Sequence, residues 1–149
     1  MPLKRLDTEA RTVVSLANDI AHEFELEYVG TEHILLAILR HDDNVGARVL
    51  HKLGLTEEKV RAAIDDLFRS AKEDTWVFGR LPGSPHYRNV IERAMEVAEQ
   101  LESQSIGSAH LLLALYHDKE STAQRTLTGL GISQKKCRDA VLRELAAAT

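Results

Sequence analysis

Histidine and cysteine side chains are the groups in this sequence best suited to metal binding or catalysis. The chain has seven histidines and one cysteine. His33 and His110 lie just inside two predicted helices, and neither has a second histidine or a cysteine at the helical spacing of a zinc site. We expect an imidazole nitrogen of each to bond to a nearby helix end or to the opposite half of the protein. Cys137 falls within an apolar helical pattern, which favours a buried small side chain over a reactive thiol.

Sequence motifs of known catalytic sites are missing. The chain contains no Gly-x-Ser-x-Gly nucleophile turn and no Gly-x-x-x-x-Gly-Lys-Ser/Thr phosphate-binding loop, so ATP hydrolysis by that loop is excluded. The adjacent acids Glu57 and Glu58, like Asp65 and Asp66, diverge on a helix rather than converge on a substrate. The sequence predicts a protein that is not an enzyme and that holds no metal and no cofactor.

Composition and charge exclude several classes of partner. The 149 residues fit one compact domain, with 44% hydrophobic residues and a net charge of −4. Acidic and basic residues are interspersed, so no basic surface for nucleic acid is expected. The longest apolar run, 34–39, is too short to span a membrane, and the first residues lack the apolar core of a signal peptide. A single cysteine cannot form an internal disulfide, which fits a reducing cytoplasm.

One helical unit occurs twice in the chain. A shift of 77 residues aligns residues 6–68 with residues 83–145 without a gap, and 17 of the 63 aligned pairs are identical. In the first helix of each copy, apolar residues recur at the spacing of one helix face, and no segment alternates like a β-strand. The positions in question are Ala10, Val13, Val14, Ala17, Ile20, Ala21 and Phe24, with their copies Tyr87, Val90, Ile91, Ala94, Val97, Ala98 and Leu101. The sequence therefore predicts an all-α duplication.

Helix caps divide each copy into four helices. The expected caps are Asp7 and Ser84 for the first helices, Thr31 and Ser108 for the second, Asn44 and Ser121 for the third, and Thr56 and Ser133 for the fourth. The second helices are expected to end near His41 and His117, and the third at Gly54 and Gly131.

A non-helical linker, 70–83, is expected between repeat one, 6–69, and repeat two, 84–146, within a single domain spanning 1–149. Its aromatic residues Trp76 and Phe78 leave two alternatives open. These side chains cover part of the core, or they form an exposed apolar patch for a partner.

The motif Gly-Thr-Glu-His-Ile-Leu-Leu-Ala at 30–37 and its copy Gly-Ser-Ala-His-Leu-Leu-Leu-Ala at 107–114 resemble the Clp repeat, as does Leu-Gly-Leu-Thr at 53–56. The resemblance is to the N-terminal domain of Clp-family unfoldases, most closely the ClpC and ClpA type, and covers residues 6–145. It implies an all-α domain of eight helices in two four-helix repeats related by a pseudo-twofold axis. It also implies a domain that precedes AAA+ modules and receives protein substrates, adaptors and, in some members, proteins marked by phosphorylated arginine.

The family's phosphoarginine pockets imply that the N–H groups opening a first helix hold the phosphate, while a glutamate of the second-helix motif pairs with the guanidinium. Here the first repeat has Glu32, but the carboxylate of its Asp7 cap would repel a phosphate, unless a one-residue shift makes Thr8 the cap. The second repeat has the neutral Ser84 cap, but Ala109 replaces the glutamate. The resemblance therefore implies weak or absent phosphoarginine binding. The alternative is that Asp7, Ser84 and Glu32 only stabilise helix ends.

A groove between the repeats, lined by the first-helix starts and the linker, is expected to capture a peptide or helix of a partner protein. The candidate contacts are Leu3, Leu6, Asp7, Thr8, Glu32, Trp76, Phe78, Arg80, Ser84 and Tyr87. The expected function is recognition of substrates or adaptors for a Clp-type unfoldase–protease. The alternative is a free-standing regulatory or structural subunit that docks on the protease complex, including its ATPase or protease subunits.

Overall fold

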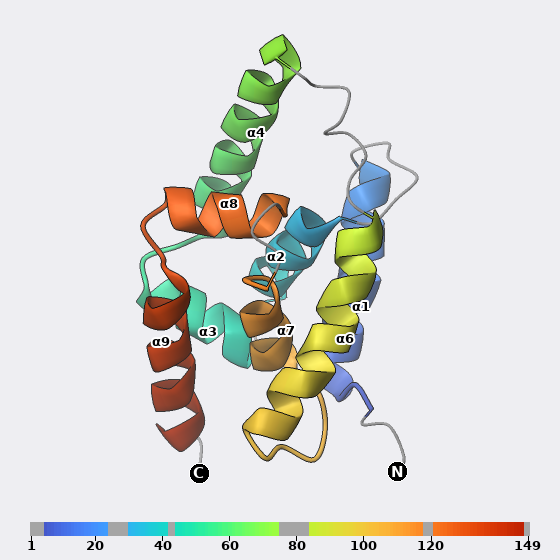
Figure 1. The fold of residues 1–149 in the computed structure, drawn as a ribbon, viewed down its shortest axis with the longest axis vertical. Helices are drawn as coiled ribbons and strands as arrows, with labels where there is room; N and C mark the ends of the chain where they lie inside the picture. The colour runs from blue at the N-terminus through green and yellow to red at the C-terminus, as the bar shows by residue number, and fades with distance from the viewer. Residues whose placement is uncertain (1–4, 24–29, 42–43, 75–83, 118–120, 148–149) are drawn as a thin grey trace.

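The computed structural model describes residues 5–23, 30–41, 44–74, 84–117 and 121–147, with only the backbone described at 68–74 and 84–89. Within these residues the fold consists of eight helices and one isolated β-bridge (Figure 1). The first repeat contains α1 (Thr8–Glu23), α2 (Thr31–Arg40), α3 (Val45–Lys52) and α4 (Glu57–Asp74). The second contains α6 (Ser84–Gln100), α7 (Ser108–Ala114), α8 (Thr122–Gly129) and α9 (Gln134–Ala147). The all-α prediction is confirmed.

The two repeats interlock instead of stacking as separate bundles. α1 packs on α2, and in the equivalent way α6 packs on α7. α3 contacts α7 and α9 of the second repeat, while its counterpart α8 contacts α2 and α4 of the first (Figure 1). These contacts across the boundary therefore occur in equivalent pairs, and α2 contacts its own counterpart α7, as a pseudo-twofold relation requires.

The core is shared by both repeats and centres on α2 and α7. α7 is buried at every residue, and α2 at every residue except Arg40, which is typical of a helix that is apolar on all sides. The predicted apolar stripe of α1 faces this core, with Ala10, Val13 and Ala17 fully buried. Its copy on α6 does the same where side chains are described, with Ala94 and Ala98 fully buried. No helix among the described residues is long and apolar enough to cross a membrane.

Most predicted caps are confirmed. Asp7 Oδ1 accepts from Ala10 N–H at 2.8 Å, and Asn44 Oδ1 accepts from Ala47 N–H at 2.8 Å. Side-chain oxygens of Ser121, Thr56 and Ser133 accept equivalent bonds, each at 3.2 Å. The third helices end at left-handed glycines, Gly54 with φ +90° and Gly131 with φ +87°.

The predicted caps Thr31, Ser108 and Ser84 are wrong, and Ser84 is itself the first residue of α6. Extended backbone places Gly30 and Gly107 at the cap positions, and Thr31 and Ser108 are the first helical residues. Their hydroxyls instead accept bonds from the opposite repeat: Thr31 Oγ1 from Ala123 N–H at 3.1 Å, and Ser108 Oγ from Gly46 N–H at 2.9 Å.

Two helix ends also differ from prediction. α7 stops at Ala114, and the chain turns tightly as the N–H groups of Tyr116 and His117 donate three residues back, to Leu113 and Ala114. α4 continues to Asp74, so residues 70–74, which were expected to belong to the linker, are helical.

Candidate functional site

The start of α1 lies against the start of α7 from the other repeat. Asp7 N–H donates to the carbonyl of Ile106 at 2.8 Å, and Ile106 N–H donates to the carbonyl of Arg5 at 2.8 Å. These two bonds form a parallel bridge between Leu6 and Ile106. We call this cluster, Leu6, Asp7, Thr8 and the segment 106–109, the α1–α7 end.

The Asp7 carboxylate occupies the α1–α7 end. One oxygen caps α1, and the other faces Gly107, where a Cβ would lie only 2.9 Å from Oδ2. Glycine at 107 therefore leaves space for the carboxylate. Thr8 is exposed and already helical, so the shift that would make Thr8 the cap is wrong.

Glu9 ties the α1–α7 end to α3. Its Oε1 accepts from Val45 N–H and from Ser108 Oγ, both at 3.2 Å. Since Ser108 Oγ also accepts from Gly46 N–H, one polar network joins the starts of α1, α3 and α7. This network holds the cluster in place on three helices.

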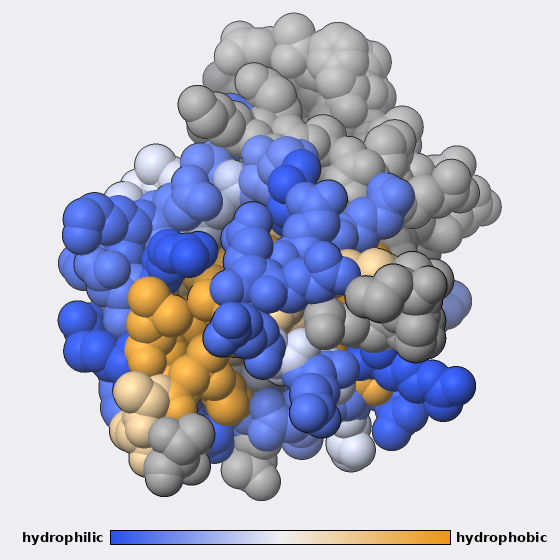
Figure 2. Space-filling view, turned by 60° about the horizontal axis from the view of Figure 1, so that its bottom comes forward, coloured by the Kyte–Doolittle hydropathy of each residue, from blue (hydrophilic) through white to orange (hydrophobic). Residues whose placement is uncertain are grey.

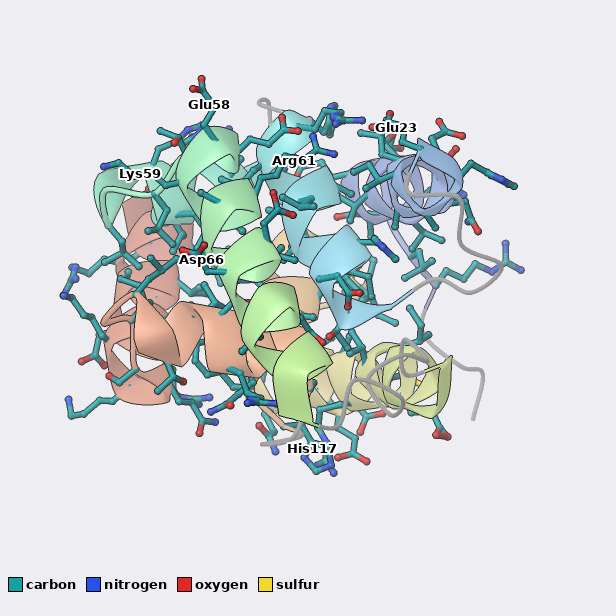
Figure 3. The ribbon with its side chains drawn as sticks, turned by 90° about the horizontal axis from the view of Figure 1, so that it is seen from above. Glu23, Glu58, Lys59, Arg61, Asp66 and His117 are labelled. Carbon is teal, nitrogen blue, oxygen red and sulfur yellow. The ribbon has the colours of Figure 1, made fainter. Side chains whose placement is uncertain are left out.

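The start of α2 forms the second cluster, and α6 contacts α2 at the same end of the molecule (Figures 1 and 3). We call Gly30, Glu32, His33 and the backbone start of α6 the α2–α6 end. Here the Glu32 carboxyl folds back over the start of its own helix. It lies so close to Gly30 that a Cβ at this position would be only 2.5 Å from Glu32 Oε1.

Glu32 is almost completely buried, with 1% of its surface exposed. Its Oε2 has no hydrogen-bond partner among the described residues and lies 3.8 Å from His33 Nε2. Burial raises the pKa of Glu32 to about 7, although a bond to its own backbone N–H acts in the opposite direction. A large part of the Glu32 population is therefore protonated near neutral pH.

His33 and His110 have the predicted structural role at helix ends. Gly30 N–H donates to His33 Nδ1 at 2.8 Å, and Gly107 N–H donates to His110 Nδ1 at 2.8 Å. An accepting Nδ1 places the proton of a neutral imidazole on Nε2. Burial lowers the pKa of His33 to about 4, so this histidine is neutral at physiological pH. Among the described residues, no group of three His, Cys, Asp or Glu side chains is arranged to hold a metal ion.

Asp7 and Glu32 do not share a pocket, contrary to the expected combination of elements within one repeat. α1 is 16 residues long, so its two ends lie about 24 Å apart. The chain reaches α2 only after the far end of α1, and Figure 1 shows α1 and α6 running in opposite directions, with their starts far apart. The structure therefore combines the start of each first helix with the second helix of the other repeat.

The remaining predicted contacts are only partly visible. Leu3, Trp76, Phe78 and Arg80 lie outside the described residues, as do the side chains of Ser84 and Tyr87 in α6. Sequence reasoning missed Ile106 and Gly107 as neighbours of Asp7. The signal was a glycine three residues before each motif histidine, because glycine at a cap allows a close approach by another chain segment.

A family model described as the Clp repeat (R) N-terminal domain matches residues 5–130. The chain belongs to the Clp repeat N-terminal domain family. Over 145 residues it is 33% identical to ClpC/MecB, a negative regulator of genetic competence from Bacillus subtilis (strain 168). It is 31% identical over 145 residues to the chaperone protein ClpB of Oceanobacillus iheyensis. Each match covers 97% of this chain but 18% of the relative, so the chain spans about 18% of their length.

The fold of this Clp repeat domain matches that of a solved relative. The N-terminal domain of ClpD from Arabidopsis thaliana superimposes with a TM-score of 0.74, covering 98% of this chain and 97% of that domain. At 22% identity this likeness shows the fold alone. The two helix-start clusters described above are therefore built on a known all-α architecture.

Proposed function

We propose that this chain is a non-catalytic protein-binding domain that recognises substrates or adaptors for a Clp-type unfoldase–protease in the cytoplasm. The observation that supports this most is the match to ClpC/MecB along 97% of the chain. The geometry supports it because both repeats contribute a helix to each helix-start cluster, which suits capture of a polypeptide segment by shape and oriented polar groups.

The proposal is tested by cross-linking from the α1–α7 end. A photoreactive amino acid at Thr8, which is exposed beside the Asp7 carboxylate, should capture adaptors or unfolded substrates presented with the cognate unfoldase. Thr128, an exposed threonine on α8, provides the matched control position. Equal capture from both positions, or capture from neither, would contradict the proposal.

We further propose that phosphoarginine binds weakly or not at all. At the α1–α7 end, the Asp7 carboxylate already accepts from Ala10 N–H at the start of α1, and Ala109 has no carboxylate for a guanidinium. At the α2–α6 end, Glu32 has the carboxylate, but it is buried and folded over Gly30. Calorimetry with free phosphoarginine should show binding at least ~10-fold weaker than for a domain with two complete pockets, which corresponds to about 1.4 kcal/mol.

A gain-of-binding variant tests the crosswise arrangement of the helices. The double substitution Asp7→Thr with Ala109→Glu supplies a neutral cap and an acid at one end, and should increase phosphoarginine affinity. Asp7→Thr alone, which leaves only Glu32 of the same repeat as the acid, should not. Tight binding by the unmodified domain would overturn the weak-binding proposal.

A further inference from the structure

An apolar strip lies on the outer face of α9, away from both helix-start clusters. Leu142 is 40% exposed, more than any other large hydrophobic residue among those described. Ala146 and Ala147 are exposed beyond it, and Leu145 is half-buried beside it. Figure 2 shows this hydrophobic surface as a continuous band at the lower left, where α9 ends, bordered by hydrophilic side chains.

Basic residues extend this strip along the helix. Positions 135, 138, 142 and 145 follow one another at three- or four-residue spacing, so Lys135, Arg138, Leu142 and Leu145 lie on one side of α9. Arg143 adds an exposed cation on the flank. The outer face is therefore basic in its first half and apolar in its second.

The acids of α9 are already paired. Asp139 accepts from Lys135 at 2.9 Å, and Glu144 accepts from Lys52 of α3 at 2.6 Å. Glu144 also accepts from Arg48 of α3 at 3.1 Å.

Three further cations on α9 form no salt bridge within the described part of the chain, although Arg138 and Arg143 lie close enough to Asp139 to help lower the pKa of its carboxyl. The three cations are Lys136, Arg138 and Arg143.

The equivalent helix of the first repeat has the opposite charge. Residues 57–67 of α4 contain four acidic and two basic side chains, whereas the aligned residues 134–144 of α9 contain four basic and two acidic ones. At the position of Leu142, α4 has the exposed Asp65. Figure 3 shows Glu58 of α4 pointing into solvent, and its counterpart on α9 is Lys135.

One partly exposed ion cluster of the first repeat shows the reversal of charge most clearly. Arg61 lies 3.7 Å from both Glu23 and Glu57. For its counterpart Arg138, the positions aligned with Glu23 and Glu57 are Gln100 and Gln134. The second repeat keeps the arginine and lacks both of its counter-ions.

The cations of α9 do not stabilise this helix. Cations near a helix N-terminus oppose the helix dipole, and the first turn of α9 has no acid, whereas α4 begins with Glu57 and Glu58. An exposed leucine beside cations that form no salt bridge among the described residues also contributes little to the stability of the isolated domain. Residues that break local stability rules without a compensating contact point to a binding role.

We propose that the α9 face formed by Arg138, Leu142 and Leu145, with Arg143 on its flank, binds an acidic amphipathic helix of a partner protein. The partner's leucines pack against Leu142 and Leu145, and its carboxylates pair with Arg138 and Arg143. The inference rests on the proposed function only in that the partner is a polypeptide. It assigns that partner to a surface different from the helix-start clusters.

The test uses a labelled synthetic peptide that carries leucines at helical spacing flanked by glutamates, with a scrambled peptide of the same composition as control. Fluorescence anisotropy gives the affinity, and amide NMR shifts of the whole domain locate the bound peptide. We expect the shifts to map to α9 and Leu142→Asp to weaken binding at least ~10-fold. Arg138→Glu should also weaken binding, and a peptide with lysine in place of glutamate should recover it. Thermal melting checks that both variants remain folded.

Asp65→Leu, the matched change on α4, should leave peptide affinity unchanged. Equal binding of the scrambled peptide, unchanged affinity of Leu142→Asp, or self-association of the domain through the acidic α4 would overturn the inference. Peptide shifts that map to a helix-start cluster would overturn it while leaving the proposed function standing. Failure of cross-linking from Thr8 would count against the proposed function alone.

Discussion

Thr31 on α2 supplies the hydrogen-bond acceptor for the start of α8, because its Oγ1 accepts from Ala123 N–H at 3.1 Å. The same relationship recurs with Ser108 on α7 and Gly46 on α3, at 2.9 Å. Each second helix therefore satisfies a free N–H group at the start of the other repeat's third helix. Both residues are buried, at 2% and 0% exposed, so these bonds link the two repeats away from bulk solvent.

Replacing Thr31 by valine should destabilise the domain by about 1–3 kcal/mol. Valine keeps the shape of threonine but leaves the buried Ala123 N–H without its acceptor. Thr8→Val is a matched control, since Thr8 also begins a helix but is exposed. Urea unfolding of the three proteins measures the difference, and equal loss in both variants would contradict the cross-repeat role.

Replacing Glu32 by glutamine should change how stability depends on pH. The pKa of Glu32 rises from 4.5 to about 7 in the folded protein, so the unfolded chain releases this proton first. The free energy of unfolding contributed by Glu32 therefore falls as pH rises from 4.5 to about 7. We expect Glu32→Gln to gain stability relative to the parent across that range, by about 3 kcal/mol at most.

His33 changes stability with pH in the direction opposite to Glu32, which makes the test more specific. Its pKa falls from 6.5 to about 4 on folding, so its contribution to stability is lost as pH falls through that range. In the parent protein the contributions of Glu32 and His33 to the pH dependence of the unfolding free energy oppose each other. In Glu32→Gln, only the contribution of His33 should remain. Denaturant titrations across this pH range provide the measurement. Glu58→Gln, at an exposed site, controls for net charge, and parallel curves for parent and Glu32→Gln would refute the assignment.

Gly107→Ala should be destabilising because its methyl group meets the Asp7 carboxylate at 2.9 Å. The side chain of Asp7 can rotate away, but α1 then loses its cap, at a cost of about 1 kcal/mol. In a double-mutant cycle, Asp7→Ala and Gly107→Ala should together cost less than the sum of the single changes. Additive losses would show that the two residues do not interact.

Cys137 should resist thiol reagents in the folded protein. It is fully buried, and burial raises the pKa of its thiol to about 12. Beside it, Tyr116 O–H donates to the carbonyl of Ile132 at 2.7 Å. Labelling with a chromogenic disulfide at about pH 8 should be slow in buffer and fast in denaturant. Rapid labelling of the folded protein would contradict the burial of this thiol.

The fold was predictable because its signals are local or repeated. Asp7, Asn44 and Gly54 act within a few residues of their positions in the sequence, and the 77-residue register copies each of these elements. The helix-start clusters were less predictable, because they depend on which helix ends meet. Thr31 has the composition of a cap in its own helix, yet a distant contact with Ala123 determines its role. No periodicity in one segment reveals a partner 92 residues away.

The exchange of α3 and α8 across the pseudo-twofold axis has a consequence for the chain as a whole. Neither half can close its own core, because the third helix of each half packs on the second and fourth helices of the other. In this sense the protein resembles a dimer whose two subunits are joined in one polypeptide. If the chain were cleaved between the two repeats, we expect each fragment to fold only after it binds the other fragment or a second copy of itself.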